Sequence, residues 1–478
     1  MEQQLIKKKE IVSILLRNNI LVNRELLRKL SEPRIVDEWH RALLDGTPPA
    51  KLLHPAQEGD SRAKVVWEYD DVPKKRSVQD FVDYFNARYR QIHKILSGRA
   101  ELQNLTSISR IRMKKDKERC SVIGIISDKN VTKNEHIMLS VEDSTGTIKI
   151  LINKSNKDLY TQAQDLVFDE VIGICGQAAE DILFAETIVI PDIPIQEPKL
   201  APEETYVCVL SCIHVGSAGF EHERFNNFIK WTCGEFGDDT MRAIAKKLRY
   251  IFACGDLVDG VGIYPAQEKE LSITDIKEQY AECARLLSQI PKHITLLLAP
   301  GNHDVGRISE PQPRLLKEYA KPLYDLPNAL LVTNPSIINI HAGEHFPGVD
   351  VLMYHGYSFD DYSECVPSIK HSGTHISDRA ALVMRFLLQR RHLAPQHTST
   401  LYIPDARYDP LVIERVPDLF VAGHIHKAGH LQHRSATIVA GSCFQKKTDF
   451  QEKVGHDPDP GVVPVINLQT RQVTMLRF

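Results

Sequence analysis

Five short motifs rich in histidine, aspartate, asparagine and glycine follow one another in the second half of the chain. In order they are Cys212-Ile213-His214, Gly255-Asp256, Gly301-Asn302-His303-Asp304, His355-Gly356 and Gly423-His424-Ile425-His426. A lone histidine at a strand end is usually a hydrogen-bonded structural residue, so one motif alone would be weak support for a metal site. Five of them, each placed at the end of an apolar run, predict one site at which their side chains converge.

The donors in these motifs suit divalent metal ions. Imidazole, carboxylate and carboxamide groups together are ligands of manganese, iron or zinc. Hydrolysis of a phosphodiester needs polarised oxygens, a hydroxide generated near neutral pH and a stabilised leaving alkoxide, and two metal ions ~4 Å apart can supply all three. Such a pair requires a shared carboxylate, and the glycines beside the ligands permit tight turns into one crevice. The motifs therefore predict two-metal phosphoester hydrolysis.

The elements that must position these motifs are strands of an α/β layered domain. The apolar runs are YVCVLS, RYIFACGD, HITLLLAPG, VDVLMYHG and PDLFVAGH, and helix-like stretches separate them. This pattern is typical of a layered domain with its chemistry at the strand ends. We place the domain at 205–478, after a linker at 191–204 in which Pro191, Pro194, Pro198 and Pro202 recur.

A second domain is predicted at 105–190, where the apolar pattern has a period of two. A helix-like interruption from Lys157 to Leu166 separates the first strands from a final pair, an arrangement that resembles the OB-fold β-barrel. This fold often binds single strands by stacking. Aromatic residues are scarce here, however, and core packing explains Tyr160, Phe168 and Phe184 better. We therefore interpret the barrel as a surface that docks a partner.

The first 98 residues divide into a small helical module at 1–45, a linker at 46–76 and a connecting helix at 77–98. Two short amphipathic helices are expected in the module, from Ile11, Ile14 and Leu15 and from Leu26, Leu27 and Leu30. In the linker, proline and glycine interrupt the periodic apolar pattern. Ser77 is a candidate N-cap, after which apolar residues recur at helical spacing: Val78, Phe81, Phe85, Ile92 and Leu96.

The composition restricts which classes of protein this chain can belong to. A chain of 478 residues with 42% hydrophobic and 25% charged residues predicts a folded protein of two or three domains. The formal net charge of -3 excludes a broadly basic nucleic-acid coat, so any contact with nucleic acid must be local. Nine cysteines without CxxC spacing argue against a zinc ribbon or a disulfide framework. The sequence shows no membrane span and no signal peptide pattern, and we expect a cytoplasmic protein.

The motif order GD, GNHD, H, GHxH resembles that of the calcineurin-like metallophosphoesterases, roughly from Tyr206 to Phe478. A finer resemblance is to the small subunits of archaeal family D DNA polymerases, through CIHVGS, GDLVDGVGIYP, APGNHDV, YHGYSFDD, FQKKTDFQEK and the helix FVDYFNARY. It implies a metal-dependent 3′-to-5′ exonuclease that acts on single-stranded or mismatched DNA ends in replication. It also implies a separate large catalytic subunit as partner, and it leaves open whether the N-terminal helices bind that subunit, a sliding clamp or nothing.

The resemblance further implies a role for each motif residue. One metal would be held by His214, Asp256 and His426, and the second by Asp256, Asn302, His355 and His424, with Asp256 bridging. Manganese is expected, with iron or zinc as alternatives. His303 would be the acid or transition-state stabiliser near the leaving oxygen. Asp304 would orient His303, or alternatively cap a helix.

Cys212 departs from the family pattern, which has aspartate two residues before His214. A thiolate is a softer ligand and would favour zinc or iron over manganese. Alternatively Cys212 is a small buried strand residue, since Cys208, Leu210 and Cys212 alternate onto one face. Two other functions remain open: a scaffold that stabilises the large subunit while its own metal site is weakened, and a free-standing phosphoesterase acting on nucleotides or phosphoproteins.

Overall fold

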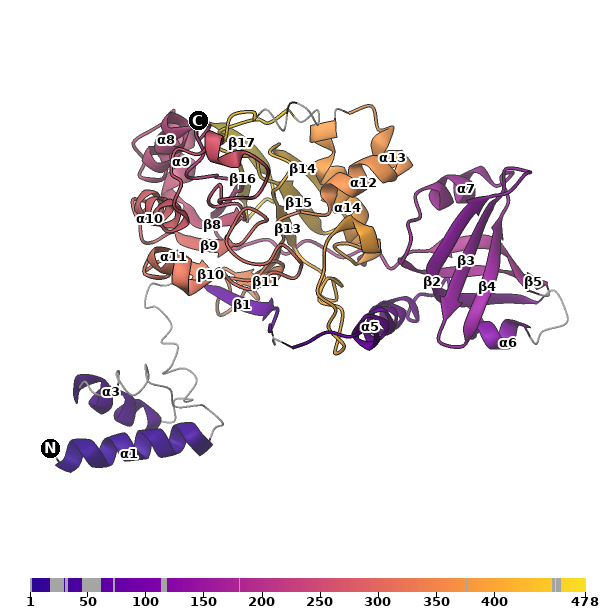
Figure 1. Cartoon of the computed structure of the whole chain (residues 1–478), viewed down its shortest axis with the longest axis horizontal. Coiled ribbons are helices and arrows are strands. Elements are labelled where there is room, and N and C mark those ends of the chain that lie inside the picture. Colours follow the sequence, from indigo (N-terminus) through magenta and orange to yellow (C-terminus); the bar gives the residue numbers. More distant parts are fainter. Residues whose placement is uncertain are drawn as a thin grey trace. The chain divides into compact units, whose positions relative to one another are not determined.

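The computed structural model describes residues 2–17, 30, 33–44, 62–71, 74–112, 118–179, 181–374, 376–448, 452 and 457–478. The chain divides into two compact units, Met1–Ser61 and Arg62–Phe478, whose elements are labelled in Figure 1. Within the described ranges, every helix is too short or too polar to cross a lipid bilayer.

The first unit contains two helices, α1 (Glu2–Arg17) and α3 (Pro33–Leu44). Their small core contains the fully buried Ile11 and Val36, and an ion pair of 2.7 Å joins Lys7 to Asp37. Helix α1 agrees with the first predicted helix, whereas α3 was not predicted. The second predicted helix, given by Leu26, Leu27 and Leu30, falls outside the described residues except for Leu30.

The second unit begins with a strand inside the segment predicted to be a linker. Strand β1 (Ala63–Glu68) pairs antiparallel with β11 (Ser336–Ile340). Ala63 and Val65 pack against the core that the two sheets of this unit share, while Lys64 points away from it. The linker prediction for 46–76 is therefore wrong at this strand, because the alternation in AKVVWE supplies one apolar face to a sheet edge.

Helix α5 (Val78–Leu96) begins directly after the predicted cap, Ser77. The backbone N–H of Ser77 donates to the carboxylate of Asp80 at 2.7 Å, which fixes the first turn. Buried residues recur at intervals of four along the helix: Tyr84, Arg88, Ile92 and Leu96. This face lies against the barrel and the loops of the sheet domain, so α5 joins the two parts of the second unit.

The barrel is closed by five strands in the order β2-β3-β4-β6-β5. They are β2 (Arg119–Val131), β3 (Ile137–Asp143), β4 (Gly146–Ile152), β5 (Val171–Ala179) and β6 (Ile182–Val189), with α6 (Ile108–Arg112) before them and α7 (Lys157–Gln164) between β4 and β5. Aliphatic side chains fill the interior. Phe168 and Phe184 are 43% and 44% exposed, so the prediction that packing explains them is wrong. Phe184 lies on the outward face of β6, and Phe168 lies in the loop before β5.

Two six-stranded sheets form the rest of the unit, in the orders β1-β11-β12-β13-β15-β14 and β10-β9-β8-β7-β16-β17. The remaining strands are β7 (Tyr206–Leu210), β8 (Leu248–Cys254), β9 (Thr295–Ala299), β10 (Ala329–Leu331), β12 (Val349–Met353), β13 (Leu419–Ala422), β14 (Gly429–His433), β15 (Ala436–Ala440), β16 (Val462–Asn467) and β17 (Val473–Arg477). The α/β class predicted from the sequence is confirmed.

The inner faces of the two sheets share one core, to which Val209 and Phe252 contribute from one sheet and Val351 and Val421 from the other. Helices cover the outer faces (Figure 1). They are α8 (His222–Thr232), α9 (Asp239–Lys246), α10 (Ile276–Leu287) and α11 (Lys317–Tyr324) on the β8 sheet, and α12 (Phe359–Cys365), α13 (Pro367–Lys370) and α14 (Ala380–Arg390) on the β13 sheet, with short 3-10 turns at Gln267–Glu270, Ile376–Arg379 and His397–Ser399.

Candidate metal centre

Each of the five motifs directly follows a strand. Strands β7, β8 and β9 are parallel neighbours in one sheet, and β12 and β13 are parallel neighbours in the other. Their carboxyl ends therefore lie at one end of each sheet, where the connecting loops carry the motif side chains. Contacts between the motifs show that all nine predicted residues come together there.

His214 and His426 face each other at the centre of the cluster. Their Nε2 atoms are 3.1 Å apart, and both side chains are buried. The Nδ1 atom of His214 lies 3.0 Å from the carboxylate of Asp259, which only accepts, so Nδ1 carries the proton and Nε2 presents a lone pair. Burial and the neighbouring His214 hold the pKa of His426 well below its ordinary value. Two imidazole nitrogens this close require a proton or a cation between them.

Asp256 lies between this histidine pair and a second group of donors. One carboxylate oxygen is 3.8 Å from His214 Nε2 and 3.3 Å from His355 Nε2. The other oxygen accepts the backbone N–H of His303 at 2.8 Å. Burial raises the pKa of Asp256, but the charges of His355 and His303 outweigh it, and the carboxyl pKa falls well below its ordinary value. Asp256 thus has the position that a shared carboxylate needs.

His355 and Asn302 form the second group. His355 Nδ1 donates to the carbonyl of Cys254 at 2.7 Å, which directs Nε2 toward the Oδ1 atom of Asn302, 2.8 Å away. Burial opposes protonation of His355, yet the charge of Asp256 raises its pKa to about 9. A histidine that is fixed by a backbone carbonyl at one nitrogen, and that directs the other nitrogen at further candidate ligands, has the usual arrangement of a metal ligand.

His424 lies at the edge of this second group. Its ring centroid is 5.1 Å from that of His355, and its Nε2 atom is 3.1 Å from the carboxylate of Asp360. The backbone N–H of His424 donates to the sulfur of Cys212 at 3.3 Å. The side chain is 13% exposed, more than those of His355 and Asp256.

The sulfur of Cys212 lies within reach of both groups of donors. Its distances to the ligand atoms of His214 and His426, and to those of Asp256 and His355, are all within 4.8 Å. Burial, followed by the charge of Asp256, raises the pKa of the thiol well above its ordinary value. Cys212 is fully buried, but it lies in the loop after β7 and not in the strand that one interpretation expected, and it neighbours the candidate ligands.

His303 and Asp304 have different surroundings. His303 Nδ1 lies 2.8 Å from the carbonyl of Asp259 and donates to it, so Nε2 is the ring nitrogen that this contact does not use. Within the described ranges, the Asp304 carboxylate accepts from the backbone N–H groups of Gly301 and Leu257 and from the Tyr280 hydroxyl. Asp304 thus holds the loops together instead of orienting the His303 ring, and it caps none of the described helices.

The backbone at this site is strained. Five predicted site residues adopt left-handed φ angles: Cys212 (50°), His214 (55°), Asp256 (52°), His424 (71°) and His426 (60°). Each such residue costs on the order of 1 kcal/mol. Gly301 is required for a different reason, since a Cβ there would lie 2.2 Å from a carboxylate oxygen of Asp256. Strain of this kind persists where the surrounding structure imposes it, commonly at functional sites.

Residues that the sequence analysis did not single out support the histidines from behind. The carboxylate of Asp259, fully buried, accepts from His214, from Gln445 at 2.8 Å and from Gln267 at 3.1 Å. Asp259 belongs to GDLVDG, three residues after Asp256, so this motif was a sequence signal that could have identified it. Gln445 and Gln267 carry no motif, and only the fold shows that they lie here.

The donor set fits divalent metal ions. Imidazole nitrogens, a carboxylate, a carboxamide oxygen and a thiol converge on one buried space, and such a mixture suits borderline ions. The facing nitrogens of His214 and His426 fit the same conclusion, because a cation can take the place of the proton that the two nitrogens share.

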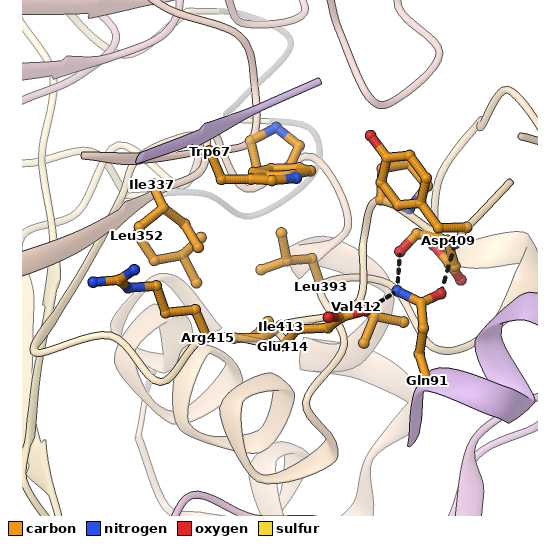
Figure 2. A pocket seen from close by; sticks show the side chains of 13 residues that line it. Trp67, Gln91, Ile337, Leu352, Leu393, Asp409, Val412, Ile413, Glu414 and Arg415 are labelled. Atoms are coloured by element: carbon orange, nitrogen blue, oxygen red, sulfur yellow. Dashed lines mark hydrogen bonds between the residues drawn. The ribbon is translucent and has the colours of Figure 1, made fainter. Parts of the chain in front are cut away.

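A separate pocket of about 570 Å³ lies between β1, α5 and the loop 408–415 (Figure 2). Trp67 stands over the apolar side chains of Ile337 and Leu352. At the other side, Gln91 donates to Glu414 at 2.6 Å and accepts from the backbone of Asp409 at 2.7 Å. No predicted site residue lines this pocket, so it is a feature distinct from the metal centre.

Comparison with known proteins assigns the chain to a family. Residues 233–430 match the B-subunit family of DNA polymerases alpha and epsilon. The DNA polymerase II small subunit of Methanothermobacter thermautotrophicus is 38% identical over 82% of this chain and 78% of its own length. That of Archaeoglobus fulgidus is 34% identical over 94% of the chain and 88% of its own length.

A third relative, from Pyrococcus furiosus, is 36% identical over 83% of this chain but only 63% of its own length. Several relatives are thus considerably longer than the part that this chain matches. The identity and coverage of these matches confirm the resemblance seen in the motifs. The chain belongs to the small subunits of archaeal DNA polymerase II, the family D DNA polymerase.

Proposed function

We propose that this small subunit is a two-metal phosphodiesterase that removes nucleotides from the 3′ end of single-stranded or mismatched DNA during replication. The observation that carries the proposal is the position of Asp256 between two groups of donors. A carboxylate in this position can hold two cations close together, as phosphodiester hydrolysis by a metal pair requires.

In this proposal one metal would be held by His214, Asp256 and His426, and the second by Asp256, Asn302, His355 and His424. When bound, the ions supply charge stabilisation and a nucleophile at neutral pH. The protein's own residues hold the histidine ligands in the required tautomers. Asp259 fixes the tautomer of His214, and the carbonyl of Cys254 does the same for His355.

His303 is proposed as the group that assists departure of the leaving oxygen. Its backbone N–H holds Asp256, and its Nδ1 atom is committed to the carbonyl of Asp259. Nε2 is therefore the atom that can hold a proton or donate a hydrogen bond at the reacting phosphate. We assign Asp304 to the support of the loop.

We propose that the barrel serves assembly. The family implies a large catalytic subunit, and we propose that the barrel, in the manner of an OB-fold, docks it. The exposed Phe168 and Phe184 are suited to such a contact. We propose that the two sheets and their covering helices are the layered sandwich of a metallophosphoesterase, and that the subunit acts in the cytoplasm.

The test is manganese-dependent degradation of a 3′-mismatched primer by the full chain and by its His303→Ala variant. We expect hydrolysis to fall by roughly 10²- to 10⁴-fold in the variant, with metal content and binding of the large subunit unchanged. Wild-type rates in His303→Ala would refute the role of this residue.

The second candidate, a scaffold with a weakened metal site, is favoured by Cys212 standing where the family pattern has aspartate. It predicts no degradation by the wild-type chain and substoichiometric metal, together with normal binding of the large subunit. Metal content measured on the same preparation therefore decides between the two functions.

A further inference from the structure

Two buried carboxamides lie behind the second group of donors. The side chains of Gln312 and Asn334 are 4% and 0% exposed. Gln312 follows the loop that carries Asn302, and Asn334 lies between β10 and β11. Their backbones pair in both directions, at 2.7 and 3.1 Å. Buried carboxamides need partners for their donors and acceptors, and neither residue belongs to the motifs that predicted the metal centre.

The two carboxamides connect the peptide groups that precede Asn302 and His355. The Nε2 atom of Gln312 donates at 2.9 Å to the carbonyl of Gly301, the residue before Asn302. The Oε1 atom of Gln312 accepts from Nδ2 of Asn334 at 2.7 Å. The Oδ1 atom of Asn334 accepts the backbone N–H of His355 at 2.8 Å. Three consecutive hydrogen bonds thus join one candidate ligand to the other.

The direction of each bond in this chain is determined by its partners. The nitrogen of the Gln312 amide faces the carbonyls of Gly301 and Arg307, which only accept. Its oxygen must then face the nitrogen of Asn334, and the oxygen of Asn334 must face the N–H of His355, which only donates. A reversed carboxamide would leave buried groups without partners, which is costly. Each side chain therefore has one favoured orientation.

Glu310 supports the same loop from a second direction. Its fully buried carboxylate accepts from the hydroxyls of Tyr354 and Thr400, each at 2.9 Å. Its other oxygen lies 3.4 Å from Nδ2 of Asn334. Since Tyr354 directly precedes His355, Glu310 holds the loop of this histidine through Tyr354 as well as through Asn334.

We propose that Gln312 and Asn334 are positioning residues, which set the separation of Asn302 and His355 and thereby the affinity for the second metal ion. The inference rests on the proposed two-metal function and names what makes its second half able to bind. The Oδ1 atom of Asn302 is 2.8 Å from Nε2 of His355, and both atoms would be ligands of one ion. A shift of either preceding peptide group moves its ligand atom.

The first group of donors has supports of its own. Asp259 orients His214, and Gln445 and Gln267 donate to the carboxylate of Asp259. The two groups therefore depend on different carboxamides, and each can be weakened by itself. A residue that served only the stability of the fold would not distinguish between the two ions.

The experiment titrates the metal-free full chain with manganese and measures bound ions by electron paramagnetic resonance. Asn334→Leu and Gln312→Met approximately keep the size of each side chain and remove its hydrogen bonds. We expect each variant to bind one ion roughly 10- to 100-fold more weakly, as is typical when a partner of a ligand is lost, and the other ion within about twofold of the wild type. The two variants alter opposite ends of the chain of hydrogen bonds, so either one tests the role if the other does not fold.

Two further variants assign the weakened ion. Gln445→Met, which removes a support of Asp259, should weaken the ion that Asn334→Leu spares. In a His355→Ala background, where the second group has already lost a ligand, Asn334→Leu should change the affinity for the remaining ion by less than about twofold. Equal weakening of both ions by Asn334→Leu would overturn the proposal.

Asn339→Leu is the matched control for the loss of a buried carboxamide contact. Asn339 is a half-buried residue of β11 that donates to the buried carboxylate of Asp350 at 2.8 Å. Asp350 lies near the start of β12, whereas His355 follows its end. The control variant should bind both ions as the wild type does, and the same selective loss in Asn339→Leu would overturn the proposal.

A crystal structure of metal-free Asn334→Leu gives a readout that needs neither metal nor activity. The distance between Asn302 Oδ1 and His355 Nε2 should lengthen beyond hydrogen-bonding reach, about 3.5 Å. An unchanged distance would overturn the proposal, as would wild-type affinity for both ions in Asn334→Leu and Gln312→Met.

Failure of the exonuclease function has a different signature. Primer degradation is measured on the same preparations. If the wild type binds manganese but degrades no primer, while Asn334→Leu and Gln312→Met still lose one ion selectively, the exonuclease function is wrong and the positioning role of the two carboxamides stands.

Discussion

Among the described residues of the second unit, two buried clusters of histidine and aspartate differ in their chemistry. In the metal centre, the Nε2 atoms of His214 and His426 face each other at 3.1 Å. In the second cluster, Asp409 accepts from Arg88 at 2.7 Å and from His392 at 2.8 Å. Every group in the second cluster thus faces a partner of the opposite kind.

The comparison separates a binding site from a structural support. The Arg88 cluster is self-sufficient: Arg88 also donates to the carbonyl of Pro395, and the N–H of Leu411 donates to Asp409. It joins α5 to the loops of the sheet domain and requires no ligand. The metal centre instead concentrates acceptors on strained backbone, so a cation stabilises it. Burial of charge alone does not distinguish the two, but the balance of donors and acceptors does.

The largest effect is expected for Asp256→Ala. Removal of the shared carboxylate should release the metal ions and reduce hydrolysis by about 10³-fold or more, because several kcal/mol of transition-state stabilisation depend on them. Metal content by elemental analysis and primer degradation test this together. The control variant Asp409→Asn, which changes the other cluster, should keep the metal ions of the metal centre. Full metal occupancy in Asp256→Ala would show that Asp256 is not a ligand.

Arg88→Leu should break the second cluster without affecting the first. Asp409 would keep a buried charge without its guanidinium partner, and such a loss typically costs about 3–5 kcal/mol. Urea unfolding of the variant should show this decrease in the free energy of unfolding, at unchanged metal content. A variant as stable as the wild type would mean that water reaches Asp409.

The same cluster predicts a pH dependence of stability. Burial and the charge of Arg88 lower the pKa of His392 to about 4, below its ordinary value of 6.5. Between these values the unfolded chain binds a proton that the folded chain does not, so stability is full above pH 6.5 and falls toward pH 4. The loss should reach up to about 3 kcal/mol. His392→Gln, which cannot titrate, should reduce this slope in unfolding measured across the range, and an unaltered slope would assign it to other groups.

The smallest effect is expected for Cys212→Asp. A carboxylate in place of the thiol restores the harder ligand, which should raise manganese-dependent hydrolysis by a few-fold and shift metal preference from zinc toward manganese. Cys208→Ser, earlier on the same stretch of chain and fully buried, is the control for a change confined to packing. An unchanged or lower rate in Cys212→Asp would mean that the sulfur does not contribute to the metal centre.

The sequence was most informative where spacing and residue type coincide. The strand runs ending in the motifs correspond to β7, β8, β9, β12 and β13, and helix α5 begins after Ser77 as its cap predicted. The nine candidate residues lie together because the carboxyl ends of parallel strands meet. These features are local patterns, which a sequence displays directly.

What the sequence did not reveal depends on contacts between distant segments. Strand β1 is defined by pairing with β11, and the short run AKVVWE lies in a proline-rich context that favoured a linker. Asp304 was expected to orient His303 or to cap a helix, but the loop from β8 places the carbonyl of Asp259 beside His303 instead. Gln445 supports Asp259 from the far end of the chain. No local pattern encodes such partners.

The pairing of β1 with β11 has a consequence for synthesis of the chain. The strand leaves the ribosome early, yet its partner follows only after the entire barrel and the first four strands of the other sheet have been made. Until then β1 is an unpaired, half-apolar edge of the kind that promotes aggregation. A fragment that starts after the barrel would expose the edge of β11 permanently, so the sheet domain is best expressed together with the residues from Arg62 onward.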